Sequence, residues 1–252
     1  MNNLENINVL VTRPNPQGKI LCEKIQMLGG ATVYLPTIEF ASPIQEIKPI
    51  SNVYDWIIFI SPEAVLRSIH LITPLPEKTR VASIGEGTAN ALHKANIAKV
   101  VYPEQNWTSE GLLDLAFFKN VHQQKILLVR GEDGREILAE TLVDRGALVD
   151  HLPVYRRVVP DYPNRSEYTE LLVKKKIDIV VCTSGESLHN LMTILGAENQ
   201  SLLIDLAIIV VSSRLVEIAK QYHFARIFQA KNASHQAIID TLCFIKGKDY
   251  VR

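Results

Sequence analysis

The sequence lacks the patterns that mark several classes of protein. Its three cysteines, Cys22, Cys182 and Cys243, stand far apart and form no Cys-x-x-Cys pair. This argues against a disulfide framework or a thiolate metal site and fits a reducing cytoplasm. Lys and Arg total 27, as do Asp and Glu, so the formal net charge is +0. Proteins that bind nucleic acid or anionic membranes depend on a surplus of basic residues, which this chain does not have.

Long hydrophobic runs are also missing. The longest apolar stretches, such as residues 56–60 and 206–211, are much shorter than the ~20 residues that span a bilayer. The first residues show no basic stretch followed by an apolar run, so no signal peptide is expected. With 47% hydrophobic and 21% charged residues over 252 positions, we expect a soluble globular protein of one large or two small domains.

Common cofactor and metal motifs fail on inspection. Gly85-Glu86-Gly87 begins like a dinucleotide fingerprint but lacks the third glycine, and no Gly-Lys-Ser/Thr phosphate loop occurs. The seven histidines include no pair three or four residues apart that could clamp a metal from one helix. We therefore expect neither an organic cofactor nor a metal.

Short Val- and Ile-rich runs alternate with amphipathic segments of helical length. Strands are predicted at 9–11, 31–35, 56–60, 80–84, 126–129, 147–154, 177–182 and 206–211. Helices are predicted at 17–28, 62–71, 88–95, 134–145, 187–195 and 214–222. This alternation favours an α/β fold with parallel sheets covered by helices on both faces.

An approximate duplication runs through this pattern. The segment from Arg13 through Gly30-Ala31 to Leu35-Pro36 is repeated 117 residues later, and Ser61 matches Ser184 at a spacing of 123. In the same order, Gly85 to Thr88 corresponds to Ser212-Ser213-Arg214. Two similar α/β lobes would explain these matches, although α/β units also resemble one another without any duplication.

Residues at the ends of the predicted strands are the candidates for ligand binding. Ligands of open α/β sheets bind beyond the carboxyl ends of the strands, where helix N-termini present free N–H groups. Arg13 and Arg130 could bind anions with their guanidinium groups. The hydroxyl residues at these ends are Ser61, Thr88, Ser184 and Ser213. Each of them could also do no more than cap its own helix.

Tyr155 is the candidate for acid catalysis. It follows the strand predicted at 147–154, in Pro153-Val154-Tyr155-Arg156-Arg157. A phenol there could donate a proton to a leaving hydroxyl group, with an arginine nearby to support negative charge on the substrate. The alternative is that Tyr155 serves only for packing, as tyrosines in strands commonly do.

Several motifs resemble those of the uroporphyrinogen-III synthases. They are Val9-Leu10-Val11-Thr12-Arg13-Pro14, Asp55 to Ser61, Ser109-Glu110-Gly111-Leu112-Leu113, Leu128 to Arg135, Val154-Tyr155-Arg156-Arg157, Thr183-Ser184-Gly185 and Ala230 to Ser234. Each motif is loose by itself, but their order and spacing cover nearly the whole chain.

The resemblance implies two similar Rossmann- or flavodoxin-like parallel-sheet lobes joined by a two-stranded connector, with the active site in the inter-lobe cleft. Lobe one would comprise residues 1–36 and 160–252, and lobe two residues 40–147. Residues 31–39 and 147–158 would be the connecting strands. Such a fold would place one lobe as an insertion within the other.

The resemblance also implies an activity. The family cyclises hydroxymethylbilane, a linear tetrapyrrole, to uroporphyrinogen III with loss of water and inversion of ring D, and it needs no cofactor. Tyr155 matches the family's proposed general acid, and Ser61, Thr88 and Ser184 match substrate-binding positions. Ser213 stands where many members have a Gly-x-x-Thr loop, so its correspondence is looser.

The expectation is a monomer in the cytoplasm, because no exposed apolar stripe is recognisable in the sequence and the separated cysteines fit a reducing compartment. The resemblance leaves open a transient contact with hydroxymethylbilane synthase, which supplies the substrate. A function of a different class is also compatible with the residues, because loops at strand ends can serve binding alone. The alternative is a bilobed, non-catalytic protein that binds small anions.

Overall fold

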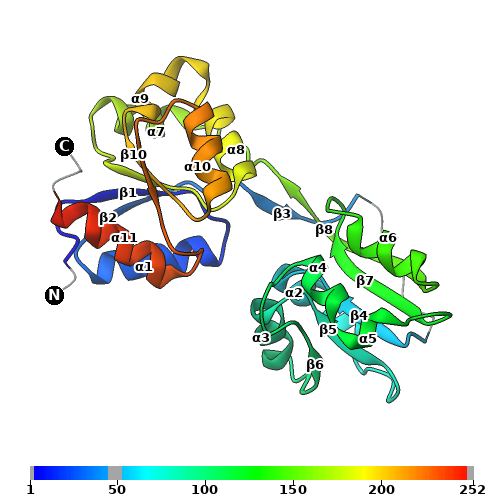
Figure 1. Cartoon of the computed structure of the whole chain (residues 1–252). Helices are drawn as coiled ribbons and strands as arrows, with labels where there is room; N and C mark the ends of the chain where they lie inside the picture. Colours follow the sequence, from blue (N-terminus) through cyan, green and yellow to red (C-terminus); the bar gives the residue numbers. More distant parts are fainter. Residues whose placement is uncertain (1–2, 45–52, 249–252) are drawn as a thin grey trace. The chain divides into compact units, whose positions relative to one another are not determined.

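The chain divides into two compact units, and a computed structural model describes residues 3–44 and 53–248. Unit 1 combines Met1–Glu39 with Val158–Arg252, and unit 2 is Phe40–Arg157. In Figure 1, unit 1 therefore contains the blue N-terminal segment and the yellow-green to red C-terminal segment, whereas unit 2 runs from the blue β3 through cyan to green. Each unit is an α/β structure built around one sheet.

Unit 1 contains a five-stranded sheet in the order β11-β10-β9-β1-β2, and all neighbouring strands are parallel. The strands are β1 (Asn8–Val11), β2 (Ala31–Tyr34), β9 (Ile179–Val181), β10 (Ala207–Val210) and β11 (Arg226–Gln229). The three central strands are almost wholly buried, which explains their continuous Val and Ile runs. The sequence did not predict β11, an edge strand with only two apolar residues.

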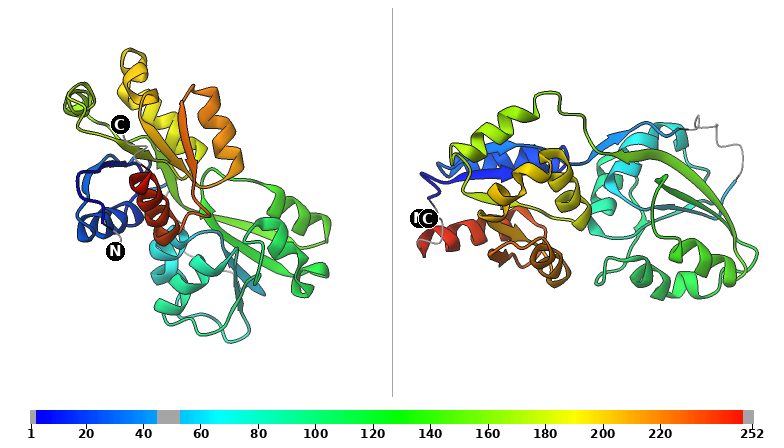
Figure 2. Two further views of the ribbon diagram at one scale, coloured as in Figure 1. Left: turned by 60° about the vertical axis from the view of Figure 1, so that its left-hand side comes forward. Right: turned by 90° about the horizontal axis from the view of Figure 1, so that it is seen from above.

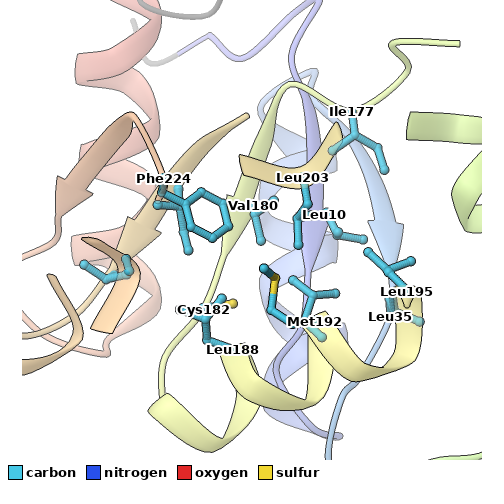
Figure 3. Close-up of a cluster of buried hydrophobic side chains, with 14 of the residues drawn as sticks. Leu10, Leu35, Ile177, Val180, Cys182, Leu188, Met192, Leu195, Leu203 and Phe224 are labelled. Carbon is cyan, nitrogen blue, oxygen red and sulfur yellow. The ribbon is translucent and has the colours of Figure 1, made fainter. Parts of the chain in front are cut away.

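Helices cover both faces of this sheet (Figures 1 and 2). On one face, α1 (Gln17–Met27) and α11 (His235–Gly247) pack in a common apolar cluster. The other face carries α7 (Arg165–Val173), α8 (Gly185–Leu195), α9 (Gln200–Ile204) and α10 (Ser213–Gln221), with the short 3₁₀ helix η1 (Ala197–Asn199). Figure 3 shows this second cluster, in which Cys182, Leu188 and Met192 lie beside Leu10 and Val180 of the sheet.

Unit 2 contains a six-stranded sheet in the order β3-β8-β7-β4-β5-β6. The strands are β3 (Glu39–Ala41), β4 (Trp56–Phe59), β5 (Arg80–Ser83), β6 (Val100–Val101), β7 (Lys125–Gly131) and β8 (Leu148–Val158). From β8 to β6 every neighbouring pair is parallel. The sequence missed β3 and β6, which are edge strands of three and two residues.

The helices of unit 2 follow the same two-sided arrangement. On one face, α2 (Pro62–Ile72) and α3 (Glu86–Lys94) contribute to one apolar cluster. On the other face lie α4 (Ser109–Asp114), α5 (Ala116–Lys119) and α6 (Ile137–Asp144). The helix predicted at 134–145 thus begins only at Ile137, after an irregular loop.

The two sheets have the same topology once unit 1 is read from β9. Strands β9, β10, β11, β1 and β2 then take the spatial positions of β4, β5, β6, β7 and β8. The registers agree as well: Ile179 pairs with Val9 and Trp56 with Ile126, residues that differ by 123 and 117. The prediction of two similar parallel-sheet α/β lobes is therefore confirmed, with one lobe a circular permutation of the other.

The segments expected to connect the lobes are largely strands of the two sheets. Residues 31–34 pair with β1 inside unit 1, and β8 pairs with β7 from Leu148 to Tyr155 inside unit 2. The chain passes from one unit to the other between Glu39 and Phe40 and again between Arg157 and Val158.

Candidate functional site

The candidate residues gather at the carboxyl edge of each sheet. In each unit the strand order reverses direction between two central strands, β9 and β1 in unit 1 and β4 and β7 in unit 2. Ligands of doubly wound sheets bind at this switch point, because the loops on its two sides leave in opposite directions. Ser184 and Arg13 follow the two strands in unit 1, and Ser61 and Arg130 hold the same places in unit 2.

Serine hydroxyls cap helices at these edges. Ser61 accepts a hydrogen bond from the Ala64 N–H at 3.1 Å, and Ser184 accepts one from the Ser187 N–H at 3.0 Å. Between β10 and α10 the capping residue is Ser212, which accepts from the Leu215 N–H at 3.3 Å. Ser213 is exposed at the first helical position, where its backbone N–H lies at the positive end of α10.

Tyr155 and Ser61 are brought together in unit 2. The Tyr155 hydroxyl lies 3.0 Å from Ser61 Oγ, and its ring packs edge-on against Phe40 with centroids 5.2 Å apart. The ring belongs to a buried apolar cluster and is only 3% exposed, whereas Ser61 is half-buried. The phenol is therefore shielded, and Ser61 is the more exposed member of the pair.

The N-terminus of α3 is open by comparison. Its N-cap residue is Gly85, so no side chain caps the first turn. Thr88 lies in that turn and is 5% exposed, and its hydroxyl makes no hydrogen bond with the described part of the chain. Helical side chains lean toward the N-terminus of their helix, which directs this hydroxyl toward the free N–H groups.

Arg130 is buried beside the loop that leads into α6. Its Nη1 pairs with Glu136, 2.9 Å from Oε1, and its Nε donates to the Gly131 carbonyl at 3.2 Å. This pairing lowers the pKa of Glu136 below its ordinary value. The Nη2 group is buried and has no partner among the described residues. A buried donor left unpaired in this way costs about 1–3 kcal/mol.

Arg13 lies at the equivalent place in unit 1 but is less deeply buried. Its Nη1 donates to the Ala233 carbonyl at 3.0 Å, and burial lowers the pKa of its guanidinium. The ring of His235, the first residue of α11, lies near Arg13, and its Nε2 is 3.2 Å from the Gln17 carbonyl oxygen. Burial, with the neighbouring Arg13, lowers the pKa of His235.

Unit 1 also contains a network of buried hydroxyls that the sequence did not indicate. Ser187 Oγ lies 2.9 Å from Thr12 Oγ1 and 2.7 Å from Thr37 Oγ1, and all three side chains are at most 1% exposed. Asn190 Nδ2 donates to the Thr37 carbonyl at 2.9 Å. The network thus ties the helix capped by Ser184 to the strand before Arg13 and to the segment that leaves unit 1.

The same positions in unit 2 are apolar. At spacings of 117, 123 and 117 residues, Thr12, Ser187 and Thr37 correspond to Val129, Ala64 and Val154. Conversely, Tyr155 corresponds to Ile38, which is also buried. Unit 1 therefore buries a group of hydroxyls at its switch point, whereas unit 2 buries the ring of Tyr155 with its phenol against the capping serine.

The described residues show neither a metal cluster nor a membrane span. Across residues 3–44 and 53–248, no group of three His, Cys, Asp or Glu residues is arranged to hold a metal ion. Within the same residues no helix is both long and apolar enough to cross a membrane.

Comparison with known proteins gives consistent matches. The family model described as "Uroporphyrinogen-III synthase HemD" matches residues 20–240. The chain is 30% identical over 247 residues to the uroporphyrinogen-III synthase of Escherichia coli K12, covering 94% of this chain and 100% of that protein. It is 32% identical over 166 residues to the enzyme of Proteus mirabilis, covering 62% and 83% of the two chains.

Solved structures agree at the level of the fold. A mutant uroporphyrinogen III synthase from the extremely thermophilic bacterium Thermus thermophilus matches with a TM-score of 0.61 and 14% identity, covering 97% of this chain and 98% of that one. The uroporphyrinogen-III synthetase of Helicobacter pylori 26695 matches with a TM-score of 0.61 and 18% identity, covering 97% and 99%.

Proposed function

The chain belongs to the uroporphyrinogen-III synthase family, and we propose that the residues described above carry out that family's ring closure. Its function is that of a cyclising lyase of porphyrin biosynthesis. The substrate we assign is hydroxymethylbilane, a flexible linear tetrapyrrole with acetate and propionate side chains. The observation that carries the assignment of residues is the contact between Tyr155 and Ser61 at the switch point of unit 2.

Tyr155 and Ser61 together act as the general acid in this proposal. The phenol donates its proton to Ser61 Oγ as the serine hydroxyl donates its own to the departing hydroxyl of the substrate, which leaves as water. The electron-rich pyrrole supplies the electrons and is left as an azafulvenium cation. The substituted carbon of ring D then attacks this cation, and the resulting spiro intermediate fragments and recloses with ring D inverted. Reclosure releases the proton of the unsubstituted ring-D carbon, which returns through Ser61 to Tyr155.

The remaining candidates hold the substrate. Each unit binds carboxylates of the substrate at the carboxyl edge of its own sheet. The donors are the backbone N–H groups in the first turns of the helices that begin near Ser61, Thr88, Ser184 and Ser213. Helix N-termini favour such anions. Arg13 and Arg130 add cationic contacts, and the unpaired Nη2 of Arg130 supports its assignment. Catalysis is then chiefly a matter of holding the chain in the conformation that inverts.

We further propose that the enzyme works as a monomer in the cytoplasm and needs no cofactor. The contact with hydroxymethylbilane synthase suggested above belongs to the same proposal, since that enzyme releases the substrate. Size-exclusion chromatography with light scattering tests whether the enzyme is a monomer. A mass near 28.3 kDa is expected, and a mass near twice that value would overturn it.

The experiment that tests the function supplies freshly made hydroxymethylbilane and separates the uroporphyrin isomers after oxidation. Without an enzyme the substrate closes at the unsubstituted position and gives the symmetric isomer I. We expect isomer III to dominate when the protein is present, and isomer I alone would refute the proposal. Titration with simple carboxylates addresses the alternative of a non-catalytic anion receptor, which would bind them as well as it binds the tetrapyrrole.

A further inference from the structure

The two tryptophans of the chain have opposite environments. Trp56 is 0% exposed in the core of unit 2, whereas Trp107 is 55% exposed in the loop between β6 and α4. A single exposed apolar side chain is not unusual by itself. Trp107 differs from the other exposed apolar side chains in its position in the fold and in the contacts that hold its backbone.

Trp107 lies against the N-terminus of α3. A Cβ at position 85 would lie 2.6 Å from Trp107 Cβ and 2.8 Å from its Cγ. Such distances are too short for any side chain, so glycine at position 85 is what allows the base of the indole to rest there. The contact places the ring at the carboxyl edge of the sheet, next to the open first turn that contains Thr88.

The backbone on both sides of Trp107 is held firmly. Asn106 has a left-handed conformation with φ 57°, and its carbonyl accepts from the Thr108 N–H at 2.7 Å. Thr108 in turn caps α4 by accepting from the Gly111 N–H at 3.1 Å. A Cβ at position 111 would lie 1.9 Å from the Asn106 carbonyl oxygen. An aromatic ring displayed on so constrained a turn loses little entropy when it binds a ligand.

Anion-binding groups lie beside the exposed ring of Trp107. The uncapped N–H groups of α3 attract a carboxylate, and the Thr88 hydroxyl has no partner among the described residues. An exposed aromatic face next to an anion-binding helix end suits a flat, electron-rich ring that carries a carboxylate side chain.

We propose that Trp107 is a substrate-binding residue that stacks on one pyrrole ring of the tetrapyrrole, while a carboxylate of that ring binds the N-terminus of α3 and Thr88. This inference rests on the proposed function, because it names a contact to the same substrate. Aromatic contacts of this kind change affinity by about two- to tenfold. Trp107 therefore affects substrate binding and leaves the chemistry of ring closure unchanged.

The test uses the natural fluorescence of the full chain. Iodide quenches only exposed indoles, so Trp107 should be quenched and Trp56 should not. Uroporphyrinogen III, kept reduced, serves as the probe because it retains the pyrroles and carboxylates of the substrate. We expect saturating uroporphyrinogen III to protect the wild-type fluorescence from iodide. The Trp107→Phe variant should lose the quenchable component.

Kinetics of matched variants give the second readout. Trp107→Ala should raise KM for hydroxymethylbilane by about two- to tenfold with kcat and the isomer ratio unchanged, and Trp107→Phe should restore most of the affinity. Phe244→Ala is the control, because Phe244 lies on α11 and is similarly exposed at 54%. It should leave KM unchanged.

The outcomes separate this inference from the function itself. If the wild-type protein makes isomer III while Trp107→Ala keeps the wild-type KM and uroporphyrinogen III gives no protection, the stacking contact is wrong and the function stands. If the wild-type protein makes only isomer I, the function fails, and the ligand assigned to Trp107 fails with it.

Discussion

The hydroxyl of Tyr155 lies 3.0 Å from the hydroxyl of Ser61, although 94 positions separate the two residues in the chain. Ser61 also caps α2, so one serine fixes the start of a helix and the orientation of the phenol. The contact exists because β8 and β4 lie on either side of β7, which brings both strand ends to the same edge of the sheet. The corresponding serine of unit 1, Ser184, has Ile38 at the place of the tyrosine.

Replacing the phenol by a phenyl ring tests this contact. Tyr155→Phe keeps the packing against Phe40 and removes the proton, so we expect kcat to fall by up to about 100-fold with the isomer ratio largely retained. The free energy of unfolding should fall by about 0.5–1.5 kcal/mol, the usual contribution of one hydrogen bond. Steady-state kinetics and urea unfolding measure the two effects. Unchanged kinetics would remove Tyr155 from the role of acid.

The buried hydroxyls of unit 1 should behave as a unit. Thr37→Val alone leaves Ser187 without one partner and should cost about 1–3 kcal/mol. The triple change Thr12→Val, Ser187→Ala and Thr37→Val installs the residues of unit 2 and removes the three hydroxyl groups together. Its cost, measured by urea unfolding, should be well below the sum of the three single changes. A strictly additive result would contradict the network.

The three thiols should differ in reactivity. Burial raises the pKa of the Cys182 thiol to about 12 and raises the pKa of Cys22 and Cys243 as well. Thiolates react and thiols do not. Because Cys243 is the most exposed of the three, an aromatic disulfide reagent at pH 8 should modify it first and leave Cys182 intact until unfolding. Modification of the Cys182 thiol before unfolding, located by mass spectrometry, would contradict the buried position of this side chain.

His235 links stability to pH. Burial and Arg13 hold the pKa of its imidazole below the ordinary value of 6.5, so the unfolded chain takes up the proton more readily than the folded one. The contribution to stability is therefore complete above pH 6.5 and is lost as the pH falls toward the folded pKa.

Proton NMR titration measures the effect on His235, with His235→Gln to assign the resonance. Arg13→Gln should raise the pKa of His235, because it removes a neighbouring positive charge. The control Arg226→Gln changes a cation on β11, which is not among the groups that shift the pKa of His235. An unaltered or lowered pKa in Arg13→Gln would contradict the arrangement around Arg13.

The sequence predicted the central strands and the duplicated order because both depend on short apolar runs. The spacings of 117 and 123 residues reappear in the strand registers of both sheets. The edge strand β11 was missed because only two of its four residues are apolar, and β6 was missed because it is only two residues long. The helix α11 was also missed, although Ser234 caps it and Ile238, Leu242 and Ile245 lie on its buried face.

Contacts across the chain were beyond prediction from local patterns. The sequence selected Tyr155 and Ser61 separately, and only the strand order shows that they touch. The hydroxyl network of Thr12, Ser187 and Thr37 joins three distant segments, and isolated serines and threonines give no sign of it. In the loop between β10 and α10, the choice between Ser212 and Ser213 depended on where the helix begins, and helix ends are poorly defined by sequence.

The central claim is that backbone N–H groups at the carboxyl edges of both sheets hold the tetrapyrrole. Amide hydrogen exchange of the full chain, with and without saturating uroporphyrinogen III, measures those groups directly. We predict slower exchange on binding at residues 61–64 and 85–88 in unit 2 and at residues 184–187 and 212–215 in unit 1. Protection confined to one unit, or found only away from these loops, would contradict the account.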